Sequence, residues 1–498
     1  MVWLRVVVSV LIAVASLNII QDVLEREGYL LIIGILSARN NTEQRQSIRD
    51  TWANLVKNNM KYLFVVGDHS CSIPPEDRVS EYDCEEWRPP KIEDIAKGGE
   101  VSSSTVNHAM ADHAAASPPR RVFTGFTFRV LHAVTLRRVS VARHLLSGSR
   151  AVKVTLSPAG GGPPLLATTL TREDLAANHS LAVSRSVTPH LLSKGFEGSL
   201  ELAVSGGPEG LWAVGHFCSF SWNMDNGVVA FLTVRTSPGD QPVPFREHLC
   251  APLAMVFTIY DPEALVLHVK ERSARQDAWN GKLRKLNHAL MSEMAWKNDI
   301  LLLDVEDTYR NLPSKMLAFY EMAYKEFEFS YLLKTDDDTF VDVKKVVKTL
   351  EDLQESEETD MHARPGPWIW SCFREFWPVQ AHGKWAEPSY RSLTYPPFPC
   401  GAGYVLSRDT VRFLALNARE HLHARFQGED VSLGIWLAGV NPERYVGGAP
   451  VNGTVPCEWT HGRDRCTATA CNKAQLSIVE MYNTWNLLNL CGNMCACT

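Results

Sequence analysis

The stretch from Tyr331 to Val343 constrains this chain most strongly. An apolar segment through Leu333 leads into three consecutive carboxylates, Asp336, Asp337 and Asp338. Side chains alternate along an extended strand, so Asp336 and Asp338 are expected on one side and Asp337 on the other. Hard oxygen ligands at a strand end suit Mg²⁺ or Mn²⁺ holding a diphosphate. The stretch therefore predicts a metal and diphosphate site, with an Asp-rich turn as the open alternative.

The N-terminal segment predicts entry into the secretory pathway. Residues Val6 to Ile20 are almost wholly apolar, with Arg5 before them and acidic residues after them. This run is shorter than the roughly 20 residues that cross a bilayer comfortably, and Ala13-Val14-Ala15 resembles a signal-peptidase site. A single-pass type II anchor and a cleaved signal both stay open. Either one places the rest of the chain in the lumen of the endoplasmic reticulum or Golgi.

The cysteines and the charge fit a lumenal protein. Half of the 12 cysteines follow residue 456, and their spacing lacks the Cys-x-x-Cys pairs of a zinc ribbon, so disulfides are expected. Asn40, Asn178 and Asn452 begin Asn-x-Ser/Thr sequons and are candidate glycosylation sites. A net charge of -6 without a long basic run argues against a nucleic-acid partner.

Hydrophobic periodicity divides the chain into an α/β domain and a β-rich insert. Apolar runs at 30–36 and 62–67 enclose a helical stretch, which predicts a β-α-β start. Between about 121 and 250 the period becomes two, which predicts an all-β, sandwich-like module with a structural or docking role. Helical patterns return after Asp277. Carbohydrate binding is the alternative role for the insert, because it contains aromatic residues that could contact a sugar: Trp212, Phe217, Phe220 and Trp222.

Two charged pairs could take part in the chemistry of the acidic strand end. Arg45 and Arg49 are four residues apart and share a helix face after the first strand, a position suited to a diphosphate. Glu429 and Asp430 open a later helix. A solvated helix face is the alternative for the arginines, and a favourable interaction with the helix dipole is the alternative for the acids.

These motifs, in this order, resemble glycosyltransferase family 31, the inverting β-1,3-glycosyltransferases. The resemblance covers about 29–67 and 270–445. It is carried by Arg45-x-x-Ile48-Arg49-x-Thr51-Trp52, Phe64-Val65-Val66-Gly67, Glu293 with Asp299-Ile300-Leu301, Asp307-Thr308-Tyr309-Arg310-Asn311-Leu312 with Lys315, Lys334-Thr335-Asp336-Asp337-Asp338, Lys384-Trp385, Tyr395-Pro396-Pro397-Phe398, Cys400-Gly401-Ala402-Gly403-Tyr404 and Glu429-Asp430-Val431. One departure is Pro313-Ser314, which stands where the family has Thr-x before the lysine.

The resemblance implies a GT-A fold, a Rossmann-like nucleotide-sugar-binding domain, and metal-dependent transfer from a UDP-sugar. The implied metal ligands, for Mn²⁺ or Mg²⁺, are Asp336, Asp338 and His461. Asp430 would be the general base for the acceptor hydroxyl, with Glu429 beside it. The implied nucleotide-sugar-binding residues are Arg39, Arg45, Arg49, Lys315, Asp336, Asp337, Gly401 and Gly403.

The long insert and the ending from Cys491 to Cys497 resemble one branch of the family. Members of that branch move GalNAc from UDP-GalNAc in β-1,3 linkage onto a terminal GlcNAc of a glycoprotein, as on the O-mannosyl glycans of α-dystroglycan. Two alternatives stay open: a β-1,3-galactosyltransferase that uses UDP-galactose, and a non-catalytic lumenal glycan-binding protein of the same fold. The intact Asp336, Asp338 and Asp430 favour an enzyme.

The expected organisation has six parts. They are an anchor or signal with a short stem at 1–28, the first part of the GT-A domain at 29–87, a linker at 88–120, the inserted β module at 121–250, the rest of the GT-A domain at 251–445 and a Cys-rich tail at 446–498.

Overall fold

The chain forms two compact units. The α/β unit comprises 1–70, 283–377 and 395–498, and the β-rich unit comprises 71–282 and 378–394. The computed structural model describes residues 28–106, 123–146, 151–175, 182–205, 220–223, 226–235, 243–244, 252–359, 366–387, 389–446, 457–462 and 466–496. The apolar segment at Val6–Ile20 lies outside this range. Within the range, no helix is both long and apolar enough to cross a membrane.

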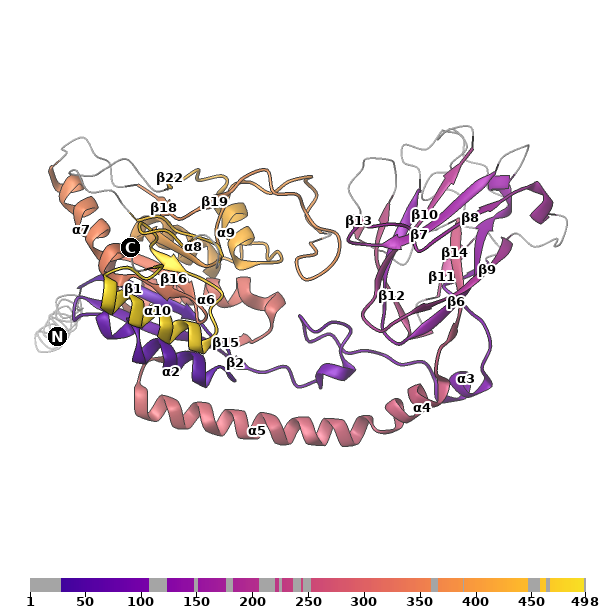
Figure 1. The fold of residues 1–498 in the computed structure, drawn as a ribbon, viewed down its shortest axis with the longest axis horizontal. Helices are drawn as coiled ribbons and strands as arrows, with labels where there is room; N and C mark the ends of the chain where they lie inside the picture. The colour runs from indigo at the N-terminus through magenta and orange to yellow at the C-terminus, as the bar shows by residue number, and fades with distance from the viewer. Residues whose placement is uncertain are drawn as a thin grey trace, which may run out of the picture. The chain divides into compact units, whose positions relative to one another are not determined.

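A seven-stranded mixed sheet forms the centre of the α/β unit (Figure 1). In spatial order its strands are β15 (Ile300–Glu306), β2 (Met60–His69), β1 (Gly28–Leu36), β16 (Glu328–Asp336), β21 (Gly403–Ser407), β18 (Trp368–Trp370) and β22 (Glu443–Tyr445). The first four run parallel, whereas β21 is antiparallel to both of its neighbours. Parallel strands covered on both faces read as continuous apolar runs, which is why β1 and β2 were recognisable in the sequence.

Helices cover both faces of this sheet. One face packs against α6 (Leu312–Glu326), α8 (Arg408–Arg419) and α9 (Glu429–Leu437). The other packs against α2 (Thr42–Asp50), α7 (Val343–Thr359) and α10 (Ile478–Cys491). Alternate residues of β1 point to opposite faces, so that Ile32 joins the first cluster and Ile33 the second. β16 is therefore the central strand of a three-layer unit.

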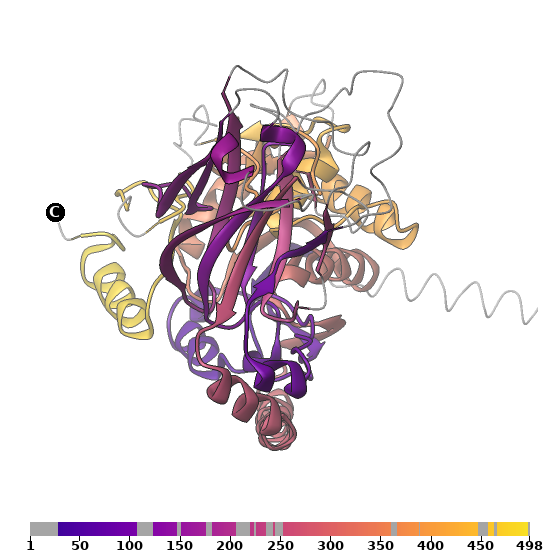
Figure 2. The ribbon, with the colours of Figure 1, turned by 90° about the vertical axis from the view of Figure 1, so that its right-hand side faces the viewer.

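Two antiparallel sheets share one hydrophobic core in the β-rich unit (Figure 2). The six-stranded sheet has the order β13 (Val243–Pro244), β12 (Val229–Arg235), β5 (Gly125–Val130), β10 (Glu197–Val204), β7 (Val152–Pro158) and β8 (Leu166–Leu170). The four-stranded sheet has the order β3 (Val101–Ser102), β14 (Leu253–Ile259), β6 (Val134–Ala142) and β9 (Ala182–Leu192). The remaining elements of this unit include β4 (Ser104–Val106), β11 (Phe220–Trp222), α3 (Ile92–Lys97) and α4 (Pro262–Lys270).

The boundaries of the β-rich unit differ from those expected. The expected linker contains α3, β3 and β4 up to Val106, while 107–120 lies outside the described residues. Beyond residue 250, β14 pairs with both β3 and β6 and so belongs to this unit. The 26-residue helix α5 (Arg272–Lys297) begins in the β-rich unit and ends in the α/β unit. The boundaries of the β-rich unit are set by pairing between strands that are far apart in the sequence, and local composition does not reveal such pairing.

One of the aromatic residues singled out in the insert is part of its core. The Trp222 side chain is buried and packs edge-on against Phe126 and Phe231. It is therefore unavailable to a carbohydrate. Trp212 and Phe217, and the side chain of Phe220, lie outside the described range.

Disulfides cross-link short stretches of the chain, with sequence separations of 13 to 29 residues, and their presence is what the cysteine content predicts. The four bonds between described cysteines are Cys71–Cys84, Cys372–Cys400, Cys457–Cys471 and Cys466–Cys495. No cysteine in the described part of the chain is free. Of the three sequons, Asn40 is exposed at the start of α2, whereas Asn178 and Asn452 fall outside the described residues.

Candidate active site

The acidic motif stands where β16 ends. Asp336 is the last residue of the strand, and Asp337 and Asp338 form a turn. Asp336 and Asp337 point to opposite sides, because Asp336 contacts Lys334 and Asp337 contacts Asn41. Side chains alternate between the two faces of the sheet only as far as Asp336, where the strand ends. The turn, and not the strand, therefore sets the position of Asp338.

Lys334 is a fully buried cation that organises the carboxylates on one side of this strand end. Its Nζ lies 2.8 Å from Asp336 Oδ1 and 2.8 Å from Glu429 Oε1, and it also donates to the carbonyl of Gly401. Burial alone would lower the pKa of Lys334, but the charges of Asp336 and Glu429 outweigh burial and raise it. We missed this role in the sequence, although Lys334 and Asp336 are two residues apart on one strand and so share a side.

Glu429 and Asp430 begin α9 after Gly428, which has a φ of 88°. Glu429 is buried and ion-paired with Lys334, whereas Asp430 forms no ion pair with any described residue. The Asp430 Oδ1 accepts a hydrogen bond of 2.8 Å from the backbone N–H of Val431. Burial, together with the neighbouring charge of Glu429, raises the pKa of Asp430 to about 7. A carboxylate with a raised pKa is a stronger base once ionised.

Two glycines bring the backbone close to these side chains. A Cβ at Gly401 would lie 3.1 Å from Asp430 Oδ2, and a Cβ at Gly403 would lie 2.3 Å from the ring of Trp459. We predicted that both glycines allow a donor sugar to approach. Internal packing alone already favours glycine at both positions, because a side chain would meet Asp430 or Trp459, and the predicted contact with a donor sugar stays a prediction.

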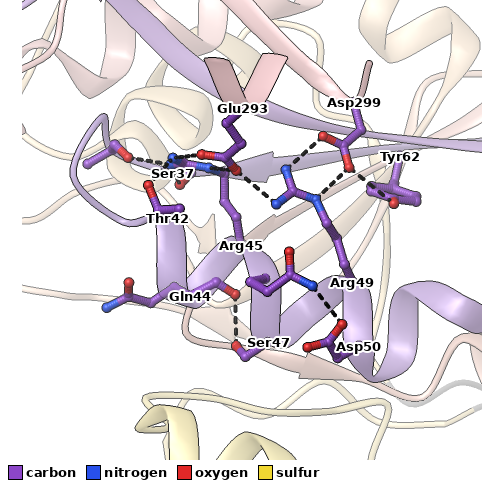
Figure 3. Close-up of polar contacts among 12 residues, drawn as sticks. Ser37, Thr42, Gln44, Arg45, Ser47, Arg49, Asp50, Tyr62, Glu293 and Asp299 are labelled. Carbon is purple, nitrogen blue, oxygen red and sulfur yellow. Dashed lines mark hydrogen bonds and ion pairs between the residues drawn. The ribbon is translucent and has the colours of Figure 1, made fainter. Parts of the chain in front are cut away.

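Arg45 and Arg49 form a buried ionic cluster with two acids (Figure 3). Arg45 donates to both oxygens of Glu293, at 2.9 and 2.7 Å. Arg49 lies 2.8 Å from Glu293 and forms two hydrogen bonds with Asp299, which also accepts one from the Tyr62 hydroxyl. Burial opposes the charge of Arg49, but its two acidic partners raise its pKa. These contacts hold α2 to α5 and to the start of β15, which supports a structural role.

Arg39 and Lys315 are also buried and engaged with the protein. Arg39 donates to the carbonyl of Gly67 at 2.9 Å and to the side chain of Asn287 at 2.8 Å. Lys315 donates to the Ser37 carbonyl and to Asp307, each at 2.7 Å. Arg39 holds the segment after β1 to the end of β2, and Lys315 links the same segment to the residues that follow β15. The predicted contact of these cations with a diphosphate stays a prediction.

A pocket of about 640 Å³ lies at the ends of β18 and β20 (Phe398–Pro399) and includes His461. Its lining residues are Cys372, Phe373, Arg374, Glu375, Trp377, Cys400, Glu458, Trp459, Thr460, His461 and Thr467. Cys400 precedes Gly401, which lies against Asp430. The pocket and the acidic strand end are thus joined through one short segment. Trp377 and Trp459 were not predicted as site residues.

The chemistry of the acidic strand end fits a divalent cation. Asp336, Asp338, Glu429 and Asp430 influence one another electrostatically, and Lys334 is the cation paired with two of them. Burial and the charges of Glu429 and Asp338 raise the pKa of Asp336 although Lys334 lowers it, so negative charge is in excess. Within the described range, no group of three or more His, Cys, Asp or Glu residues is arranged to hold a metal ion. The ligand set implied by the resemblance, Asp336, Asp338 and His461, stays a prediction, and the two carboxylates are the members of it that lie at the strand end.

Known proteins are similar to this chain over most of its length. Residues 280–445 match the family model described as Galactosyltransferase. The chain is 33% identical over 481 residues to UDP-GalNAc:beta-1,3-N-acetylgalactosaminyltransferase 2 of Danio rerio, with 94% of this chain and 91% of that protein covered. It is 30% identical over 478 residues to the Homo sapiens protein of the same name, with 94% and 89% covered.

A second kind of relative is similar over a shorter stretch. Beta-1,3-galactosyltransferase 6 of Mus musculus is 35% identical over 184 residues, which are 35% of this chain and 54% of that protein. The similarity to the first two relatives extends over nearly the whole chain and so includes the β-rich unit. The mixed α/β sheet with its acidic strand end is consistent with a GT-A-like fold. The chain therefore belongs to the galactosyltransferase family, glycosyltransferase family 31.

Proposed function

We propose that this protein transfers N-acetylgalactosamine from UDP-GalNAc, with inversion, onto the 3-hydroxyl of a terminal GlcNAc on a glycoprotein glycan. The observation that carries the proposal is similarity along 94% of the chain to relatives named for that donor and linkage. An O-mannosyl glycan, as on α-dystroglycan, is the acceptor we favour. The disulfides support a lumenal site of action, in the endoplasmic reticulum or Golgi, with the N-terminal segment as the membrane attachment.

Asp430 is the group best placed to act as the base. Its carboxylate takes the proton of the acceptor 3-hydroxyl while that oxygen forms a bond to the anomeric carbon of GalNAc. The bond from the anomeric carbon to UDP breaks, and its electron pair leaves with the β-phosphate. Glu429 is already paired with Lys334, so it holds the local charge and leaves proton transfer to Asp430.

Asp336 and Asp338 would hold Mn²⁺ or Mg²⁺. When bound, such an ion supplies a Lewis acid that offsets the charge of the diphosphate leaving group. Lys334 orients the Asp336 carboxylate from one side, and Asn41 fixes Asp337 through a hydrogen bond of 2.9 Å. These contacts preorganise the strand end before a nucleotide sugar binds.

The second candidate activity is transfer of galactose from UDP-galactose. It is favoured by the 35% identity to a β-1,3-galactosyltransferase over the shorter stretch. The two activities are separated by incubating the protein with UDP-GalNAc, UDP-galactose and UDP-GlcNAc in turn and determining the linkage of the product by NMR. Preference for UDP-galactose would replace our proposal with this candidate, and no turnover with any donor would favour a non-catalytic lectin-like role.

The base is tested with Asp430→Asn. We expect a loss of about 10² to 10⁴ in transfer rate with UDP affinity retained, which is the usual contribution of a positioned general base. Asp409→Asn is the matched control, because Asp409 is an exposed acid in the first turn of α8. An unchanged rate in Asp430→Asn would move the role to another group.

A further inference from the structure

We infer that the 640 Å³ pocket binds the terminal sugar of the acceptor glycan, with Arg374, Trp377 and Glu458 as its recognition residues. This inference rests on the proposed function and extends it to the residues that select the acceptor. The pocket has the size of a small-molecule site, for which about 300 to 1,000 Å³ is typical. Its lining combines aromatic rings with charged groups, as a pyranose ring with its hydroxyl groups requires.

Most of the pocket lies away from the donor side. Its lining includes no residue of β1, β2 or α2, and of the implied metal ligands it includes His461 but neither Asp336 nor Asp338. It lies instead beside β18 and β21, on the other side of β16 from β1. Cys400 lines the pocket and Gly401 next to it approaches Asp430, so a sugar held there has its hydroxyl groups near the proposed base.

Two charged groups of the pocket, Arg374 and Glu458, are available to a ligand. The Arg374 side chain makes no hydrogen bond or ion pair with any described residue, and its guanidinium stacks on the Trp377 ring at 4.3 Å. The Glu458 side chain likewise has no polar partner within the described range, whereas its backbone is bonded to Cys471. A guanidinium group that donates hydrogen bonds and a carboxylate that accepts them can together bind sugar hydroxyl groups directly. Trp377 keeps 37% of its surface exposed and offers an apolar face.

Both walls of the pocket are fixed before a ligand arrives. The first wall, 372–377, is held by the Cys372–Cys400 disulfide and by the pairing of β19 (Phe373–Arg374) with β20. The second wall, 458–461, is held by the Cys457–Cys471 disulfide and by Asn472, which bonds the backbone of Thr460 in both directions at 2.7 and 2.9 Å. Such rigidity lowers the entropic cost of binding a flexible glycan.

The inference is tested with Trp377→Ala and Arg374→Ala, and with Trp296→Ala as the matched control. Trp296 lies on α5 with 88% of its surface exposed and does not line the pocket.

The measurements are KM for a β-GlcNAc glycoside at saturating UDP-GalNAc, the rate of UDP-GalNAc hydrolysis without acceptor, and the Kd for UDP. We expect each pocket variant to raise the acceptor KM by about tenfold or more, equivalent to about 1.4 kcal/mol. The rate of hydrolysis and the Kd for UDP should stay within about twofold of the wild-type values. This margin is small compared with the expected tenfold change in the acceptor KM. Trp296→Ala should change none of the three.

Two outcomes would overturn the inference. An unchanged acceptor KM in both pocket variants would show that the acceptor binds elsewhere. A parallel loss of hydrolysis and UDP affinity would assign the pocket to the donor. If the wild-type protein neither transfers nor hydrolyses GalNAc from UDP-GalNAc, the proposed function fails. Calorimetric titration of the glycoside then still tests the pocket, because loss of binding in Trp377→Ala and Arg374→Ala supports it and unchanged binding refutes it.

Discussion

Replacing Arg45 with methionine separates a structural from a nucleotide-binding role for the buried arginines. Arg45 is fully buried and shares Glu293 with Arg49, which in turn is bonded to Asp299 (Figure 3). The four charges sum to zero in the folded protein. Arg45→Met leaves one excess negative charge on Glu293, whose side chain is 7% exposed.

The expected cost is large because a buried charge loses its partner. Breaking a buried ion pair by removing one member destabilises a protein by about 3 to 5 kcal/mol. Glu293 keeps Arg49, so we expect about 3 kcal/mol for Arg45→Met. Glu293→Gln should cost a similar amount, since it leaves one excess positive charge. The double variant restores neutrality, and its cost should fall short of the sum by about 2 kcal/mol.

The assay is urea unfolding followed by tryptophan fluorescence, with the Kd for UDP measured on the same preparations. Arg419→Met is the control, because the Arg419–Glu321 pair is exposed and should contribute less than about 1 kcal/mol. We expect Arg45→Met to lower the free energy of unfolding while changing UDP affinity little. A tenfold loss of UDP affinity with an unchanged free energy of unfolding would refute this reasoning and support a diphosphate contact.

Two other predictions concern the metal and pH. Asp338→Asn should lower the affinity for Mn²⁺, measured by calorimetry in the presence of UDP, and abolish metal-stimulated UDP-GalNAc hydrolysis; full activity of this variant in EDTA would contradict the metal role. Burial lowers the pKa of His144 to about 4, so the unfolded state binds more protons below pH 6.5. Stability of the β-rich unit should therefore be full above pH 6.5 and fall by up to about 2 kcal/mol as pH falls through 4, after allowance for partial exposure. His144→Phe should flatten the dependence of melting temperature on pH, and an equally steep dependence would assign it to other groups.

Local pattern predicted the central strands and the acidic strand end. The apolar run expected at 30–36 is β1 at Gly28–Leu36, and the run at 62–67 lies inside β2 at Met60–His69. Continuous apolar residues are a property of any strand buried on both faces, so no knowledge of tertiary contacts was needed. The limits of the second unit were not predictable in this way, because β14 is assigned to it only by pairing with β6 and β3.

Helical spacing was correct for the arginines but did not reveal their partners. Arg45 and Arg49 do share one face of α2, as four-residue spacing requires. Their acidic partners, Glu293 and Asp299, follow about 250 residues later, beyond the 71–282 segment of the β-rich unit. A sequence gives the charge of a helix face but not whether that face is buried, and burial decides whether a guanidinium meets a phosphate or a carboxylate of its own chain.

The two adjacent acids at the start of α9 show why burial also divides their roles. Sequence placed Glu429 and Asp430 together, and the dipole of the helix treats them alike. Lys334 distinguishes them. Its ammonium group, on β16, forms an ion pair with Glu429, whereas Asp430 has no ion pair among the described residues. A neutralised acid is a poor proton acceptor, whereas an unpaired one with a raised pKa is a good one. The assignment of Asp430 as the base thus depends on a lysine that the acidic motif itself carries two residues before Asp336.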